Sequence, residues 1–154
     1  MWAVSSWCPW ALSNDLEVRL YSCLASRRWA HSVATGEPAE RAMDQLTDDE
    51  WREAMKAHPR IGERGGDVPT SSEREQSRAM RASGATLATL AAENRRYEER
   101  FGHVFLIFAS GRSGEEILSE LRRRMKNDPA AELEEAKREL RKIALMRLRG
   151  LVTA

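Results

Sequence analysis

The chain has 154 residues, which fits one ordinary domain and is too short for two full-sized ones. Apolar residues make up 42% and charged residues 32%, the balance of a soluble globular protein rather than a disordered or fibrous one. The formal charge is +1, so no overall field would draw the chain to nucleic acid or to an anionic membrane. We therefore expect a single domain over residues 1–154 that binds neither.

The cysteines and the apolar runs bear on location and metal binding. Cys8 and Cys23 have no CxxC spacing and no histidine at metal-ligand spacing, so the sequence predicts neither a disulfide framework nor a zinc site. Residues 1–14 lack the basic start of a secretory signal, and the longest later apolar run, Val104–Ala109, is too short to span a bilayer. We expect a cytoplasmic protein with no bound metal.

The first two predicted helices lie before Pro59. Apolar residues at helical spacing predict one amphipathic helix over Asp15–Val33, closed by a Gly and a Pro a few residues later. Thr47-x-x-Glu50 has the form of a capping box and predicts a helix through Ala57. Proline disfavours helical geometry in the preceding residue, so His58 should lie at or just beyond the end of that helix.

The middle of the chain contains a loop and two further helices. Four Gly and Pro residues in Ile61–Ser71 predict a loop, without the Lys and Ser/Thr of a phosphate-binding loop. Ser72-x-x-Glu75 predicts the start of a helix, and another should span Ala85–Arg100 with Gly102 as its stop. The run Val104–Ala109 should be buried, either as a strand or as part of a helix.

Two helices complete the predicted fold. Ser113-x-x-Glu116 should open a helix through Lys126, and Asp128-Pro129 should start a long last helix that ends near Gly150. The sequence contains no repeat, low-complexity tract or interdomain linker. These patterns predict an all-α, single-domain bundle of about six to eight helices, with a small sheet as the main alternative.

Of the three histidines, His58 is the candidate for chemistry. Its ring is carried by the His58-Pro59 turn at a helix end, on backbone that proline stiffens. A helix C-terminus favours the imidazolium, and a pKa near 6.5 would let the ring hold or donate a proton. The alternative is a histidine that only caps the helix. His31 and His103 are interpreted as structural or surface residues.

Two further groups of polar residues have a structural and a functional interpretation. Ser72 and Glu75 can be explained as a capping box, but with Gln76 they also offer an anion-binding helix start, a carboxylate and an amide to a small ureido-bearing ligand. Arg147 continues the apolar stripe of the last helix, where a core residue is expected. Either its stem packs on the core with the guanidinium in water, or the guanidinium clamps a carboxylate.

Six motifs together resemble the OHCU decarboxylases, which act on 2-oxo-4-hydroxy-4-carboxy-5-ureidoimidazoline (OHCU) in urate breakdown. The motifs are Ser26-Arg27-Arg28-Trp29, His58-Pro59-Arg60-Ile61-Gly62, Ser72-x-x-Glu75-Gln76, Asn94-x-x-Tyr97-x-x-Arg100-Phe101-Gly102, the Phe105–Ala109 run and Lys142-Ile143-x-x-x-Arg147-Leu148. They follow the family's order over about Leu20 to Leu151. Residues 1–12 match nothing and are interpreted as an N-terminal extension.

The resemblance implies an all-α homodimeric carboxy-lyase that needs no metal or organic cofactor and forms (S)-allantoin. By resemblance, the catalytic residues are His58 and Glu75. The implied substrate contacts come from the following residues: Pro59, Ser72, Glu75, Gln76, Phe105, Leu106, Ile107, Phe108, Ala109 and Arg147. The alternative is a helical interaction module that kept this fold and lost the activity, and retention of His58 and Glu75 argues against it.

Overall fold

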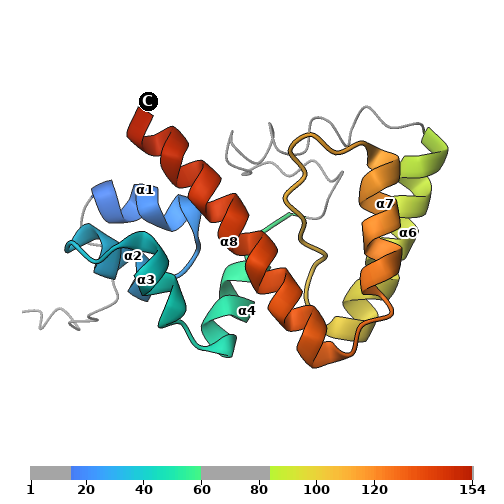
Figure 1. Ribbon diagram of the computed structural model, residues 1–154, viewed down its shortest axis with the longest axis horizontal. Coiled ribbons are helices and arrows are strands. Elements are labelled where there is room, and N and C mark those ends of the chain that lie inside the picture. The colour runs from blue at the N-terminus through green and yellow to red at the C-terminus, as the bar shows by residue number, and fades with distance from the viewer. Residues whose placement is uncertain (1–14, 60–83, 154) are drawn as a thin grey trace, which may run out of the picture.

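The computed structural model describes residues 15–59 and 84–153. In this part of the chain it has seven helices and no strand, which confirms the all-α prediction. The helices are α1 (Asp15–Cys23), α2 (Arg27–Ala34), α3 (Ala39–Asp44), α4 (Asp48–Lys56), α6 (Gly84–Phe101), α7 (Gly114–Arg124) and α8 (Pro129–Thr153). Helix α8 crosses the molecule, with α1 to α4 on one side of it and the packed pair α6 and α7 on the other (Figure 1).

Two helices begin at the capping residues that the sequence predicts. At α4 the Thr47 hydroxyl accepts from the Glu50 N–H at 3.2 Å, and the Glu50 carboxylate accepts from the Thr47 N–H at 3.1 Å. At α7 the Ser113 hydroxyl accepts from the Glu116 N–H at 3.1 Å. A cap of this kind contributes about 1 kcal/mol, so a few local residues determine where these helices start.

The start of α8 is also confirmed, but its end is not. The Asp128 carboxylate accepts from the Ala131 N–H at 2.8 Å, and Pro129 takes the first helical position. The predicted end near Gly150 is wrong, because α8 continues to Thr153. A glycine ends a helix when its backbone takes a positive φ, and Gly150 does not do so.

Helices α6 and α7 differ in how well their ends were predicted. Helix α6 contains the predicted Ala85–Arg100 helix and stops before Gly102, whose φ of 78° turns the chain out of the helix. Helix α7 ends at Arg124 rather than at the predicted Lys126. The N–H groups of Lys126 and Asn127 bond carbonyls three residues back, so the last turn tightens out of α-helical geometry.

The prediction of one helix over Asp15–Val33 is wrong, because the chain breaks between α1 and α2. Ser26 caps α2, and its hydroxyl accepts from the Trp29 N–H at 3.2 Å. The apolar pattern continues across the break because Leu20, Leu24 and Trp29 are buried in the same core. The short helix α3 lies in a stretch for which no element is predicted.

The buried apolar side chains form two clusters. The first core, between α1 to α4 and α8, includes Leu20, Trp29, Met43, Trp51, Met55, Leu133, Leu140 and Ala144. The second core, between α6 and α7, includes Leu90, Tyr97, Ile117 and Leu121. Helix α8 contributes its buried side chains to the first core. The segment that joins α6 to α7 contributes side chains to both cores, so the two groups of helices meet along it (Figure 1).

That segment contains the run Val104–Ala109, which is neither helix nor strand. Leu106 packs in the first core, whereas Phe105, Ile107 and Ala109 pack in the second. Alternation between two sides is the period of an extended chain. The predicted burial is therefore confirmed, and the choice between strand and helix is resolved as an extended segment that belongs to no sheet in the described part of the chain.

Candidate active site

His58 lies directly after α4, as the sequence predicts. Ala57 is the C-cap of the helix, and the His58 N–H donates to the Met55 carbonyl at 3.1 Å. Met55 and Trp51 bury this part of α4 in the first core, and Pro59 restricts the backbone directly beyond it. The backbone that carries the imidazole is therefore held on both sides.

The His58 imidazole is partly buried and uncharged near neutral pH. Burial, together with the positive charge of Arg147, lowers the pKa of His58 from 6.5 to about 3. The sequence left both protonation states open, since the end of a helix favours the imidazolium. Burial outweighs that effect here, so the ring is neutral at pH 7, and a nearby negative charge is needed to raise its affinity for a proton.

Arg147 lies on α8, one turn beyond the buried Ala144, and is partly buried itself. Its charge lowers the pKa of His58 at the end of α4. It also acts on the Cys23 thiol at the end of α1, whose pKa is nevertheless raised because burial outweighs the Arg147 charge. The structure thus brings His58 and Arg147 into one region, where α1, α4 and α8 meet.

Three predicted site residues, Ser72, Glu75 and Gln76, lie outside the described residues, as does the predicted loop Ile61–Ser71. Their roles therefore stay predictions. Pro59, which the resemblance also assigns to the substrate, is described and lies partly buried beside His58.

The main chain of the Phe105–Ala109 run is held from α7 and α8. The Leu106 carbonyl accepts from the Arg124 guanidinium at 2.6 Å, and the Phe108 N–H donates to the Glu139 carboxylate at 3.1 Å. In an extended chain the polar groups of residues i and i+2 point to the same edge. Both bonds therefore hold the same edge of the run.

A buried polar cluster, formed by Tyr97, Arg124 and Glu132, lies beside this run. Each of the three residues is at most 1% exposed. The Tyr97 hydroxyl donates to Glu132 Oε1 at 2.5 Å, and Arg124 Nε donates to the same oxygen at 2.7 Å. The Arg124 guanidinium also lies 4.7 Å from the centre of the Phe105 ring. Burial and the bond to Glu132 raise the pKa of Tyr97, so its hydroxyl stays a donor.

The sequence did not identify this cluster, although a signal was present. Ile117, Leu121 and Arg124 follow one another at spacings of four and three, so Arg124 takes a core position on α7. The same pattern on α8 drew attention to Arg147. Glu132, the partner of Arg124, gave no signal, because a carboxylate in the first turn of a helix is ordinarily explained by the helix dipole.

The other two histidines make local contacts. His31 Nδ1 lies 3.1 Å from the buried carboxylate of Glu17, which links α2 to α1. His103 Nδ1 lies 3.2 Å from the Val104 carbonyl, and its ring stacks near that of Phe101. These contacts fit the structural interpretation of both residues.

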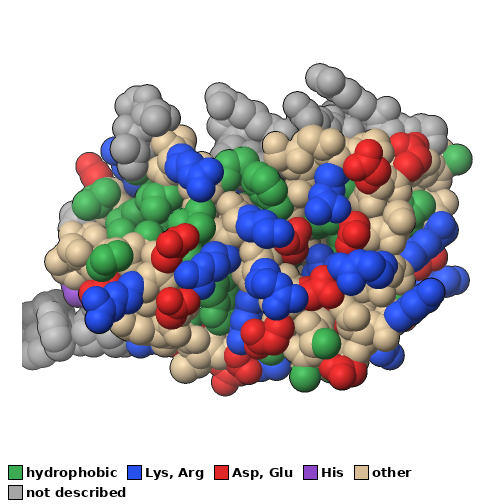
Figure 2. All heavy atoms as spheres, in the orientation of Figure 1, with side chains coloured by type: hydrophobic (Ala, Val, Ile, Leu, Met, Phe, Trp, Pro, Cys, Tyr) green, Lys and Arg blue, Asp and Glu red, His purple; other side chains and the backbone are tan. Residues whose placement is uncertain are grey.

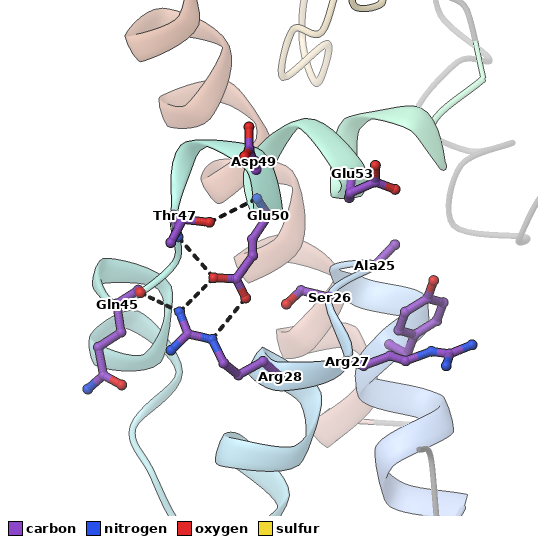
Figure 3. Close-up of a pocket in the computed structure, with 10 residues that line it drawn as sticks. Ala25, Ser26, Arg27, Arg28, Gln45, Thr47, Asp49, Glu50 and Glu53 are labelled. Carbon is purple, nitrogen blue, oxygen red and sulfur yellow. Dashed lines mark hydrogen bonds and ion pairs between the residues drawn. The ribbon is translucent and has the colours of Figure 1, made fainter. Parts of the chain in front are cut away.

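A surface pocket of about 870 Å³ lies between α1, α2 and α4. Figure 3 shows Arg28 pointing towards Glu50, with Arg27 pointing the opposite way. Both nitrogens of the Arg28 fork lie 2.8 Å from Glu50 oxygens, and the guanidinium also donates to the Gln45 carbonyl. These groups hold α2 against α4, and of the predicted site residues that the structure describes, none lines the pocket.

Charge is mixed on the face of the molecule shown in Figure 2, where basic and acidic side chains alternate over α8 and α7. Ion pairs among the described residues include Arg141 with Asp44 and Lys142 with Glu139. Among residues 15–59 and 84–153, no three His, Cys, Asp or Glu side chains are arranged to hold a metal ion. None of the described helices has the length and apolar character of a membrane span.

These features define a class: a helical protein in which a neutral imidazole and a guanidinium lie in one region. The chain belongs to the OHCU decarboxylase family, whose sequence profile matches residues 13–149. A crystal structure of OHCU decarboxylase in the presence of (S)-allantoin has 31% sequence identity and a TM-score of 0.74. The match covers 87% of this chain and 96% of that one.

Two curated relatives agree with this assignment. The uric acid degradation bifunctional protein TTL of Arabidopsis thaliana is 34% identical over 145 residues, which cover 84% of this chain and 45% of that protein. The 2-oxo-4-hydroxy-4-carboxy-5-ureidoimidazoline decarboxylase of Amia calva is 35% identical over 107 residues, 64% of this chain and 59% of that protein. The chain thus spans about half the length of these relatives.

Proposed function

We propose that the protein decarboxylates OHCU to (S)-allantoin in urate degradation, without a metal or organic cofactor. Family membership and the similarity to a structure solved with (S)-allantoin support this substrate and product. The observation that carries the proposal is the neutral His58 imidazole near the Arg147 guanidinium. Together they offer a proton acceptor and a cationic partner for a carboxylate.

The substrate needs no cofactor because the carbon that loses carbon dioxide adjoins a ring imine. When the bond to the carboxylate breaks, its electron pair moves into the ring and the imine nitrogen takes up a proton. The hydroxyl on the same carbon then loses its proton, and the neighbouring carbon, which bears the ureido group, gains one on a single face. The protein therefore has to hold the carboxylate, accept a proton and deliver a proton stereospecifically.

The hydroxyl proton, the ring carbon and the negative charge of the substrate each have a candidate group in this chain. His58 is neutral, and the negative charge of a bound substrate raises its pKa, so it can accept the hydroxyl proton and then return one to the ring carbon. Arg147 holds the negative charge of the substrate, and main-chain groups of the Phe105–Ala109 run act on charge that develops during the reaction. Glu75 is assigned by resemblance to orient His58 or the ureido group.

We further propose, on the same resemblance, that the protein is a homodimer. From the cysteine pattern we propose that it works in the cytoplasm.

The test is to add the protein to freshly oxidised urate, in which OHCU forms and decays spontaneously. Faster loss of the OHCU ultraviolet signal, with one hand of allantoin by circular dichroism, is the expected result. An inactive interaction module with the same fold would leave both the rate and the racemic product unchanged.

A further inference from the structure

The extended run Phe105–Ala109 belongs to no sheet in the described part of the chain, so its geometry has to be fixed by other groups. On one edge of the run, Leu106 accepts from Arg124 and Phe108 donates to Glu139. The side chains on either face are anchored in two different cores. The main chain of the run is consequently held in place by bonds from α7 and α8.

The Arg124 guanidinium is held in a position to donate to the Leu106 carbonyl. Its Nε and Nη2 atoms lie 2.7 and 2.5 Å from Glu132 Oε1, which leaves Nη1 to donate to the Leu106 carbonyl at 2.6 Å. Glu132 is tethered in turn by the Tyr97 hydroxyl and by the Asn127 amide, which donates to its other oxygen at 3.0 Å. A planar, fully buried guanidinium with this many partners has one orientation available to it.

We propose that Arg124 is a positioning residue for the reaction. Through the Leu106 carbonyl it sets the main-chain groups of the Phe105–Ala109 run at the place where they meet the substrate. The inference rests on the proposed function, since it takes this run to line the substrate site. Tyr97 and Glu132 act one step further back, because they fix the guanidinium of Arg124.

The key variant is Arg124→Lys, which keeps the positive charge near Glu132 but loses the planar fork. A single ammonium cannot serve both Glu132 and the Leu106 carbonyl in the same geometry. A displacement of about 1 Å at a reacting centre can cost about 100-fold in rate. We expect kcat to fall by about 10- to 100-fold with a smaller change in KM, and the excess of (S)-allantoin to fall with it.

The matched control is Arg123→Lys on the neighbouring residue. Arg123 is half exposed and pairs with Glu120 and Glu135, so this variant makes the same chemical change without touching the run. It should keep the wild-type kcat and enantiomeric excess. An inactive wild type would refute the proposed function itself. If the wild type is active, the difference between Arg124→Lys and Arg123→Lys measures the role of Arg124.

A residue with only a structural role would lower the melting temperature and leave kcat, KM and product chirality unchanged in the folded protein. That result for Arg124→Lys overturns the proposal. If Arg124→Lys does not fold, Tyr97→Phe removes only the hydroxyl that tethers Glu132 and keeps the ring in the second core. We expect it to lower kcat and the excess of (S)-allantoin in the same direction, and wild-type values for both would equally overturn the proposal.

Discussion

The low pKa of His58 predicts how the stability of the protein responds to acid. The pKa is about 3 in the folded protein and 6.5 is its ordinary value, which we take for the unfolded chain. Because the folded value is the lower one, the unfolded chain binds a proton below pH 6.5 that the folded protein does not. The contribution of His58 to stability is therefore complete above pH 6.5 and is lost progressively as the pH falls towards 3.

The size of the effect follows from these two values. Between pH 7 and pH 5 the linkage relation gives a loss of about 2 kcal/mol in the free energy of unfolding from His58 alone. The amide introduced by His58→Asn does not titrate, so the stability of this variant should fall by about 2 kcal/mol less than that of the wild type over this range. Other groups, including His103 with its own lowered pKa, are common to both proteins and cancel in the comparison.

The assay is urea unfolding of both proteins at pH 7 and pH 5, followed by circular dichroism at 25 °C. Equal slopes of free energy against urea concentration in the two proteins would show that the unfolded states are comparable. An equal loss of stability in wild type and His58→Asn would contradict the prediction, because it would mean that the folded environment does not disfavour the imidazolium.

Three further predictions concern the site. Arg147→Lys should lower OHCU turnover and Arg147→Gln should lower it more if the guanidinium holds the substrate carboxylate, whereas wild-type kinetics in both folded variants would remove Arg147 from the site. Glu75→Gln should lower OHCU turnover, whereas loss of a helix cap alone would cost about 1 kcal/mol of stability and leave turnover intact. A shifted melting temperature with normal catalysis would leave only the capping role. Exhaustive chelation should leave activity unchanged, and a loss restored by one specific metal would contradict the cofactorless mechanism.

Much of the fold could be predicted because its signals are local. The hydroxyls of Thr47 and Ser113 bond N–H groups three residues away, so the sequence alone places the starts of α4 and α7. The break before α2 could not be predicted in this way. Helices α1 and α2 bury their apolar residues in one core, and their combined pattern imitates a single longer helix.

The place of His58 in the fold was predictable for the same reason. His58 follows from a helix end and an adjacent proline, both visible in the sequence. Its charge state could not be predicted, because it depends on burial and on Arg147, which is close only in the folded protein. The shape of the Phe105–Ala109 run depends on Arg124 and Glu139, two residues from other helices, so periodicity within the run could not decide it.

We propose that this chain catalyses OHCU decarboxylation through His58. The most direct test compares wild type with His58→Asn in the loss of the OHCU ultraviolet signal and in the chirality of the allantoin formed, with folding of the variant checked by circular dichroism. We predict that the wild type accelerates the reaction and yields (S)-allantoin, and that the folded variant loses about 10²- to 10⁴-fold of that rate, as expected for a general acid–base group. Wild-type turnover and chirality in folded His58→Asn would contradict a catalytic role for His58.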